Sequence, residues 1–442
     1  MHESGAAAST FQMALAAILF LATYGVVMSE KVNRAIVALV AAGLMIILGV
    51  INQEAAIRGI DFNTIGLLIG MMVIVAITRQ SGIFQYLAIW SAKKVNANPW
   101  GILVMISLVT ATTSAFLDNV TTVLLVVPVT LLITEELKVK PYPYLFAMIF
   151  SSNIGGTATL IGDPPNIMIG SATGLTFNDF AYHLTPAILV VMAATLVPIY
   201  FIWGRHLKAT PEDRQRVMRF NEFEAITDWR LLKQCLTVIG IVVFGFIFAK
   251  WLHLEAATIA IFGAAVLLLL ANLGKGPDDQ SKHVLEAFNE VEWITIFFFV
   301  GLFIVVHAVD STGLLRLLAE KMVAMTGGNL HATAMIILWS SAILSAIIDN
   351  IPFVATMIPL IKAMAPTFGG ESGLLPLWWA LSLGACLGGN GTLIGASANL
   401  VVAGFAERAG QPIRFVQYTL VAFPIMLLSI VICMFYLEWR YL

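Results

Sequence analysis

The chain has 442 residues, of which 59% are hydrophobic and only 11% charged, and its mean hydropathy is +0.91. A soluble domain of this length cannot bury so much apolar surface, so the composition excludes a soluble globular protein. The formal net charge of −2 and the three widely spaced cysteines point to no nucleic-acid partner, disulfide framework, metal site or cofactor.

Apolar runs of 17 or more residues recur along the chain and are long enough to cross a bilayer core of about 30 Å as helices. The opening segment MHESGAAAST lacks the basic residues of a cleavable signal peptide, so we expect the first run to be a retained helix. In the first half, crossing helices are expected at 11–28, 33–51, 64–80 and 183–203. Two apolar stretches separated only by Asp118-Asn119, here called arms, are expected at 100–117 and 120–134, and an interrupted helical segment at 144–172.

The second half repeats this order after a polar connector at residues 204–234. Its helices and arms are expected at 235–251, 255–273, 293–309, 332–348 (arm), 351–365 (arm) and 417–438, with a Gly-rich interruption before the last helix. We therefore predict an all-α polytopic membrane protein of two repeats, residues 1–203 and 235–442, joined by the connector 204–234.

Two duplicated motifs support this division. Residues 114–129 read SAFLDNVTTVLLVVPV and residues 345–360 read SAIIDNIPFVATMIPL, which places two Asp-Asn pairs 231 residues apart. A second motif, Thr-Leu-Ile-Gly followed by Asn, recurs at a spacing of 233 residues. Several matches in order at nearly one spacing indicate an internal duplication, which is common among secondary transporters.

The distribution of Lys and Arg predicts the topology. If each pair of arms enters and leaves on the same side, 18 of the 24 basic residues fall on one side and 6 on the other, whereas one long crossing per pair would give 14 and 10. The positive-inside rule favours the first arrangement. It predicts five crossings per half, two inverted repeats, a cytoplasmic connector and two external termini.

Asp118-Asn119 and Asp349-Asn350 mark the predicted tips of two re-entrant hairpins. An ionisable residue at mid-membrane costs roughly 2.5–3.5 kcal/mol and usually marks a substrate or ion path. The alternative is that both aspartates only cap the helices that follow them. Because a neutral Ser or Asn caps a helix equally well, we interpret the aspartates as charge carriers that exchange protons.

The Gly-rich interruptions, GGTATLIGDPPN in the first half and GGNGTLIGASAN in the second, are poor helix interiors that unwind and expose backbone groups. The alternative is close packing of small residues. Because both interruptions contain Asn and Thr, we interpret them as two halves of a binding site. They are not identical, since Asp163-Pro164-Pro165 stands opposite Ala396-Ser397-Ala398.

Three further features carry their own hypotheses. His307 and Asp310, with Arg79 at the position equivalent to Asp310, are interpreted as helix-end charges, and a proton relay is the alternative. Cys386 lies beside the second interruption, where it either packs or touches a soft metalloid. No P-loop pattern occurs, so the chain does not itself hydrolyse ATP.

At FLDNVTTVLLVVPV, GGTATLIGDPPN, IDNIPFVATMIP and GGNGTLIGASAN, the sequence resembles the ion-transporter superfamily, most closely its ArsB/NhaD branch, over nearly the whole chain. This branch contains arsenite and antimonite permeases, Na⁺/H⁺ antiporters and the melanosomal P protein. The resemblance implies about ten crossing helices, two re-entrant hairpins and two broken helices in a multi-pass protein of a bacterial or archaeal cytoplasmic (inner) membrane. It allows for a homodimer and for a cytoplasmic ATPase subunit, with which some arsenite permeases work.

The resemblance also places a site between the hairpin tips and the broken helices. Asp118, Asp349 and Asp163 are then the expected proton- or ion-coupling residues. The expected substrate-binding residues are Asn119, Thr121, Asn350, Gly156, Thr157, Thr159, Asn166, Gly389, Asn390, Thr392 and Asn399. Related divalent-anion/sodium symporters carry Ser at the two tip positions that hold Asp here. Two carboxylates would repel a dicarboxylate, so uptake of citrate or succinate is disfavoured on charge.

Three functions are compatible with this pattern. The first is efflux of arsenite or antimonite in exchange for protons, because As(OH)₃ is an uncharged triol that Asn, Thr and backbone groups can hydrogen-bond. The second is Na⁺/H⁺ antiport through the same Asp pair. The third, an intramembrane aspartyl protease with Asp118 and Asp349 as a dyad, fits poorly because each Asp lies at an equivalent tip of an inverted repeat. We therefore expect a transporter and not an enzyme.

Overall fold

The computed structural model describes residues 10–29 and 31–442, and every regular element in these ranges is helical. The opening segment at residues 1–9, including its predicted external position, lies outside the described residues. The helices of the first half are α1 (Thr10–Met28), α2 (Arg34–Ile47), α3 (Gln53–Arg58), α4 (Phe62–Arg79), α5 (Ile83–Lys94), α6 (Pro99–Phe116), α7 (Asn119–Glu136), α8 (Tyr142–Thr157), α9 (Pro164–Thr173) and α10 (Phe177–Ile202).

The connector contains α11 (Pro211–Met218) between two short 3₁₀ turns, Gly204–His206 and Glu222–Ala225. The helices of the second half are α12 (Trp229–Leu252), α13 (Ala256–Asn272), α14 (Pro277–Asn289), α15 (Trp293–Ser311), α16 (Leu314–Thr326), α17 (Leu330–Ser345), α18 (Asn350–Ala363), α19 (Leu375–Gly388), α20 (Ser397–Arg408) and α21 (Phe415–Tyr441), with 3₁₀ turns at Glu371–Leu374 and Gly389–Gly391. Helices α3, α5, α14 and α16 lie outside the crossing segments and arms that the sequence predicted, and each has 13 residues or fewer.

By length and composition, nine helices that the structure describes could cross a membrane, or ten if α16 and α17, which bend by 118°, form one span. This confirms the predicted all-α polytopic fold. The count includes both arms α6 and α7 and omits α2 and α13, which have only 14 and 17 residues. Length alone cannot separate an arm from a span, since the 18 residues of α7 extend about 27 Å at 1.5 Å per residue.

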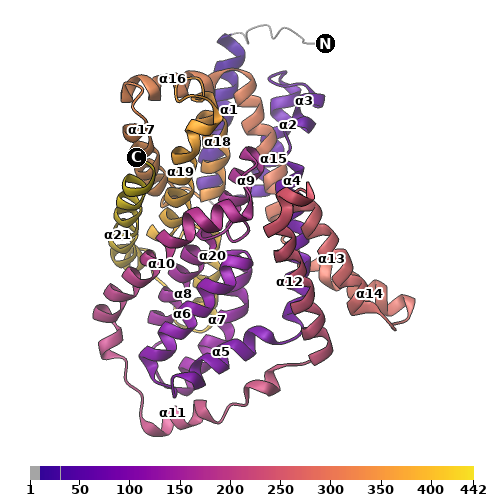
Figure 1. Cartoon of the computed structure of the whole chain (residues 1–442), viewed down its shortest axis with the longest axis vertical. Helices are drawn as coiled ribbons and strands as arrows, with labels where there is room; N and C mark the ends of the chain where they lie inside the picture. The colour runs from indigo at the N-terminus through magenta and orange to yellow at the C-terminus, as the bar shows by residue number, and fades with distance from the viewer. Residues whose placement is uncertain (1–9, 30) are drawn as a thin grey trace.

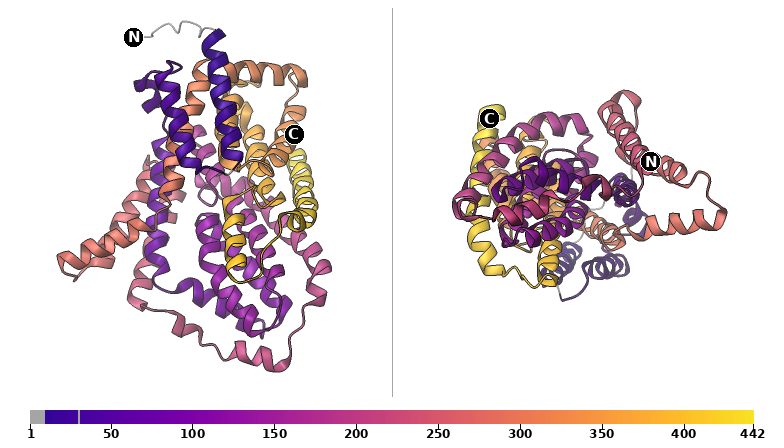
Figure 2. Two further views of the ribbon diagram at one scale, coloured as in Figure 1. Left: turned by 180° about the vertical axis from the view of Figure 1, so that it is seen from behind. Right: turned by 90° about the horizontal axis from the view of Figure 1, so that it is seen from below.

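The two pairs of arms approach each other from opposite ends of the molecule. In Figure 1, α6 and α7 rise from the end where α5 and α11 lie, whereas α17 and α18 descend from the end where α16 lies. The connector with α11 occupies the end opposite the start of α1, and the C-terminus lies nearer the end where α1 starts (Figures 1 and 2). The cytoplasmic position of the connector remains a prediction from the charge count.

The two halves exchange packing partners. Helix α2 of the first half packs on α15 of the second, and α13 of the second packs on α4 of the first. Glycine permits both contacts, because a Cβ atom at Gly70 would lie 2.6 Å from the carbonyl carbon of Ala260, and one at Gly301 would lie 2.5 Å from that of Ala38. The duplicated glycines, 231 residues apart, are therefore points of close backbone approach in two equivalent interfaces.

The connector is held against α5 and the end of α7 by side-chain contacts. Lys93 on α5 pairs with Glu222 and also donates to the carbonyl of Phe220 at 3.2 Å. The hydrogen bond from Lys93 holds the pKa of Glu222 below its usual range. Arg216 on α11 donates to the carbonyl of Glu136 at 3.2 Å, where α7 ends. The connector thus contacts the base of the first hairpin and holds it in place.

We expect Gly301→Leu to destabilise the protein, because the side chain would push α2 away from α15. Overpacking of this kind costs roughly 1–3 kcal/mol, occasionally more. The melting temperature of the purified protein in detergent measures the loss. Gly43→Leu, on the other helix of the pair, has no atom within 4 Å of its added Cβ and serves as the control. Equal melting temperatures for the two variants would contradict the interface.

Candidate functional site

Each duplicated aspartate lies at the turn between two arms and caps the second arm. Asp118 accepts the backbone N–H of Thr121 at 2.8 Å and is also bonded by the Thr121 hydroxyl. Asp349 accepts the backbone N–H of Ile351 at 3.0 Å through Oδ1, which leaves Oδ2 for another partner. Helix capping is therefore part of what both residues do, but it occupies only one oxygen of Asp349.

The two broken helices are α8–α9 and α19–α20, and one asparagine closes each break. Asn166 donates from Nδ2 to the carbonyls of Thr157 and Thr159 at 3.1 and 2.9 Å. Asn399 donates from Nδ2 to the carbonyls of Gly389 and Thr392 at 2.7 and 2.9 Å. Backbone groups inside a membrane must be satisfied within the protein, and these two side chains satisfy carbonyls that each break releases.

The hairpins are tied to the breaks by duplicated hydroxyl groups. Thr159 donates to the carbonyl of Ala115 and Thr392 to that of Ala346, in each case at the end of the first arm. Two serines act in the same way, since Ser114 donates to the Ser152 carbonyl at 2.7 Å and Ser345 to the Ala385 carbonyl at 2.6 Å. The hydroxyls of Thr159 and Thr392, which we expected to bind substrate, are thus engaged in holding the hairpins.

The paired glycines allow the backbones to approach each other. A Cβ at Gly155 would lie 2.1 Å from the Ala111 carbonyl oxygen, and one at Gly388 would lie 2.5 Å from that of Ala342, so these two serve close packing. Gly156 and Gly389, which we expected at the substrate, face the returning chain, with Cβ positions 2.6 and 2.9 Å from the carbonyl oxygens of Gly162 and Gly395.

Amide side chains from both halves meet at the centre. Asn153 on α8 donates to the Oδ1 atoms of Asn390 and Asn399 at 2.9 and 3.0 Å, and it accepts from Asn119 at 3.2 Å. On the other side of the centre, Ser382 donates to Oδ1 of Asn166 at 2.6 Å, and the Cys386 thiol lies 3.6 Å from the same oxygen. Thr157 turns its hydroxyl to the Asn153 carbonyl at 2.7 Å. Sequence reasoning missed Asn153 and Ser382.

Two polar atoms at this centre lack a partner among the described residues. Asp163 is fully buried, and its Oδ1 accepts from Asn350 at 3.3 Å, while its Oδ2 has no hydrogen-bond partner. The Nδ2 group of Asn390 is also unpaired. A buried carboxylate oxygen and a buried amide donor without partners are costly in an apolar interior, so both atoms are candidate contacts for a solute.

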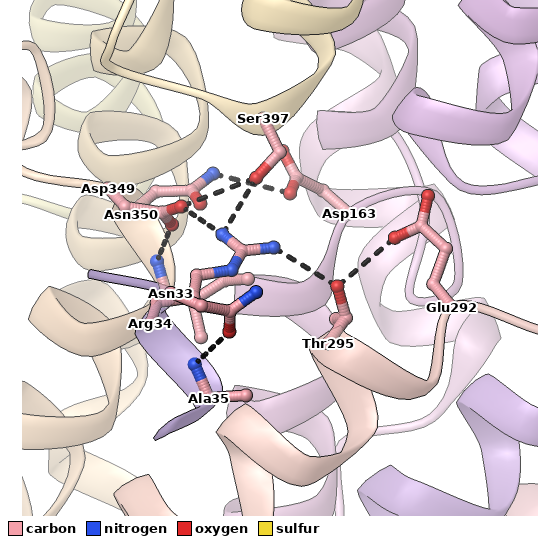
Figure 3. Close-up of polar contacts among 10 residues, drawn as sticks. Asn33, Arg34, Ala35, Asp163, Glu292, Thr295, Asp349, Asn350 and Ser397 are labelled. Carbon is pink, nitrogen blue, oxygen red and sulfur yellow. Dashed lines mark hydrogen bonds and ion pairs between the residues drawn. The ribbon is translucent and has the colours of Figure 1, made fainter. Parts of the chain in front are cut away.

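Arg34, at the first residue of α2, reaches the tip of the second hairpin. Its Nη1 lies 2.7 Å from Oδ2 of Asp349 and donates to the Ser397 hydroxyl at 2.9 Å. Its Nη2 donates to the Thr295 hydroxyl at 3.0 Å, which in turn donates to Glu292 at 3.1 Å (Figure 3). The sequence prediction missed Arg34 and Glu292. The spacing of 231 that relates Asp61 and Thr64 to Glu292 and Thr295 could have found Glu292, but Arg34 has no such signal.

A cavity of about 330 Å³ opens against this ion pair. It is lined by Val32, Asn33, Arg34, Ile347, Asp349 and Ser397, among others. A second cavity, of about 310 Å³, is lined by Asp61, His307, Asp310 and Lys362. Arg79, the counterpart of Asp310, instead pairs with Glu290 at 2.7 Å on an exposed surface. The structure therefore brings Asp118, Asp163, Asp349 and the amides to one region and leaves His307 and Asp310 in a separate cavity.

Comparison with known proteins gives the family. The family described as CitMHS, citrate transporter, matches residues 24–384. An uncharacterized transporter of Mycobacterium tuberculosis is 43% identical over 431 residues, which cover 97% of this chain and 98% of that protein. The P protein of Homo sapiens is 33% identical over 510 residues, covering 96% of this chain and 60% of the human protein.

Two solved structures share the fold. The YdaH transporter of Alcanivorax borkumensis has a TM-score of 0.60 at 14% identity, over 96% of this chain and 97% of that chain. MtrF of Neisseria gonorrhoeae, described as illuminating a class of antimetabolite efflux pumps, has a TM-score of 0.57 at 9% identity, over 96% and 94%. At these identities the likeness concerns the arrangement of helices alone.

We expect Thr392→Val to destabilise the protein, because the buried carbonyl of Ala346 would lose its hydroxyl donor. An unsatisfied buried group costs about 1–3 kcal/mol. The melting temperature in detergent is the measurement. Thr237→Val is the matched control, since that hydroxyl bonds the Lys233 carbonyl on an exposed helix surface. If both variants melted like the unmodified protein, the hydroxyl would not anchor the hairpin.

Proposed function

This chain belongs to the CitMHS family of the ion transporter superfamily and is a secondary transporter, and from that premise we propose that it exports arsenite or antimonite in exchange for protons. Membership of a transporter family excludes the aspartyl-protease alternative. In this proposal the solute binds where the hairpin tips meet the broken helices, and Asp118, Asp163 and Asp349 form the coupling group.

The unpaired Asp163 carboxylate oxygen is the observation that carries the proposal. It lies beside Asn350 at the meeting point of the two halves, and Asn390 offers an unpaired donor. An uncharged metalloid hydroxide both donates and accepts hydrogen bonds, so it can satisfy an amide donor and a carboxylate acceptor together. A carboxylate that alternates between a proton and a solute hydroxyl group supplies the exchange that antiport requires.

Na⁺/H⁺ antiport is the second candidate, favoured by the same free carboxylate. A sodium ion prefers oxygen ligands, and Asp118 and Asp163 supply them. The backbone carbonyls at the two helix breaks offer fewer free ligands for Na⁺ than the sequence indicated. Those of Thr157, Thr159, Gly389 and Thr392 already accept hydrogen bonds from Asn166 and Asn399.

Citrate, after which the family is described, meets a less favourable charge pattern. The positive charge of Arg34, which lies at the hairpin tip, is already neutralised by Asp349. The carboxylates of Asp118, Asp163 and Glu292 make no ion pair among the residues that the structure describes. A free tricarboxylate would therefore be repelled, whereas one that carries its own divalent cation would not.

Uptake of candidate solutes into everted membrane vesicles under an imposed pH gradient identifies the transported solute. We expect accumulation of radiolabelled arsenite that collapses when the gradient is dissipated, and no proton release on addition of Na⁺. Citrate is tested alone and with Mg²⁺. Proton release by Na⁺ without arsenite accumulation would select the second candidate, and citrate uptake would overturn both.

Asp163→Asn should lower proton-driven transport at least tenfold, because the side chain keeps its shape but can no longer carry a proton. The initial rate of arsenite uptake into the same vesicles measures the effect. Asp278→Asn, on the exposed start of α14, is the control for loss of one carboxylate. A rate within twofold of the unmodified protein would remove Asp163 from the coupling group.

A further inference from the structure

Arg34 makes the two duplicated aspartates unequal. Its guanidinium lies 2.7 Å from the Asp349 carboxylate, so the charge of that carboxylate is compensated within the protein. Asp118 makes no ion pair among the described residues and is bonded only within its own helix by Thr121. The start of α13, which corresponds to the start of α2 in the exchanged packing, carries Ala256 and Ala257 and hence no cation.

The Arg34 guanidinium connects two groups of helices. One group is α2 and α15, and the other is the second hairpin with α20. The guanidinium stands on α2, which packs on α15, and it bonds Thr295 of α15. It also bonds Asp349 at the hairpin tip and Ser397 at the start of α20. Any movement of the second hairpin and α20 relative to α2 and α15 must therefore separate these contacts.

A neighbouring helix reinforces the contact. Tyr24 on α1 lies 2.7 Å from the Thr356 hydroxyl of α18, and its own hydroxyl donates to the carbonyl of Pro352. Helix α2 thus holds the tip of the second hairpin through Asp349, and α1 holds the arm that follows, α18, through Pro352 and Thr356. Only the Arg34 contact involves charge.

Separation of the ion pair in this setting is unfavourable. Arg34 and Asp349 have side chains only 23% and 17% exposed. An arginine does not give up its proton, so the separated state contains a partly buried cation and a partly buried carboxylate, each without an opposite charge beside it. The cavity of about 330 Å³ beside the pair admits water, which makes this separation feasible.

We propose that Arg34 is a resident counter-cation that neutralises Asp349 and latches the tip of the second hairpin to α2 and α15. This narrows the coupling group proposed above from three aspartates to Asp118 and Asp163. Arg34 is in this sense a positioning residue. The inference deepens the proposed function and rests on it where transport is measured, but the latch itself is a property of the protein without cargo.

The first test is a double-variant cycle on proton-driven transport in vesicles. Arg34→Gln leaves Asp349 unpaired and Asp349→Asn leaves Arg34 unpaired, so each should lower the rate at least tenfold. The double variant leaves no unpaired charge and should recover at least a third of the rate. Arg34→Lys keeps the charge and should fall between. Arg58→Gln, which breaks an exposed pair with Glu54, is the matched control.

The second test needs no cargo and follows the latch directly. Val32→Cys, just before α2, and Ile347→Cys, at the hairpin tip, both line the cavity and are exposed, and they are joined by a short bis-maleimide in a background where Cys235, Cys386 and Cys433 are replaced. We expect the double variant Arg34→Gln/Asp349→Asn to cross-link at least threefold more slowly than the protein with Arg34 and Asp349 intact, because the hairpin tip spends less time against α2. Tyr24→Phe, which removes a neighbouring contact without changing charge, should have a smaller effect.

The outcomes separate the parts of the inference. Rescue of transport without slower cross-linking overturns the latch. Slower cross-linking without rescue overturns the assignment of the coupling charge to Asp118 and Asp163, because Asp349 would then carry it. If the unmodified protein moves neither arsenite nor Na⁺, the proposed function fails, and the cross-linking rates still decide whether Arg34 latches the hairpin.

Discussion

The structure depends on satisfying the backbone at two places where a helix is broken inside the molecule. Non-helical backbone is tolerated at membrane depth only where protein groups or water supply its hydrogen bonds. Asn166 and Asn399 supply them from the side chain, and Thr159 and Thr392 fasten each break to a hairpin. Because the breaks are held in this way, the hairpin tips are positioned against them, and the polar centre exists where the four elements meet.

On this nearly twofold frame the charges are placed without symmetry. Asp163 faces Asn350 across the centre, but its counterpart in the second half is Ala396. Arg34 pairs with Asp349 at one hairpin tip, whereas Asp118 at the other makes no ion pair among the residues that the structure describes. A duplicated scaffold with unequal charges provides two similar surfaces for alternate access while giving each carboxylate a different task, which two identical halves could not do.

Much of the fold could be predicted from sequence because it rests on long apolar periods and on duplicated motifs. The arms, the breaks and the asparagines that close them, Asn166 and Asn399, were all visible as repeats. The roles within the site were less visible. Thr159 and Gly156 serve the backbone as structural contacts, and Arg34 is brought to Asp349 from 315 residues away by the packing of α2 on α15. A contact between halves that occurs once leaves no repeat to detect.

The exchange of α2 and α13 between the halves has a consequence for biosynthesis. The face of α4 at Gly70 packs closely on α13, around Ala260, so the first half lacks this contact when it leaves the ribosome. At about 5–20 residues per second this face stays uncovered for roughly 10–40 s. During this interval lipid or another protein has to cover the face that α13 covers in the finished structure. An ancestral single half would have had to find that cover in a second copy inserted the opposite way round.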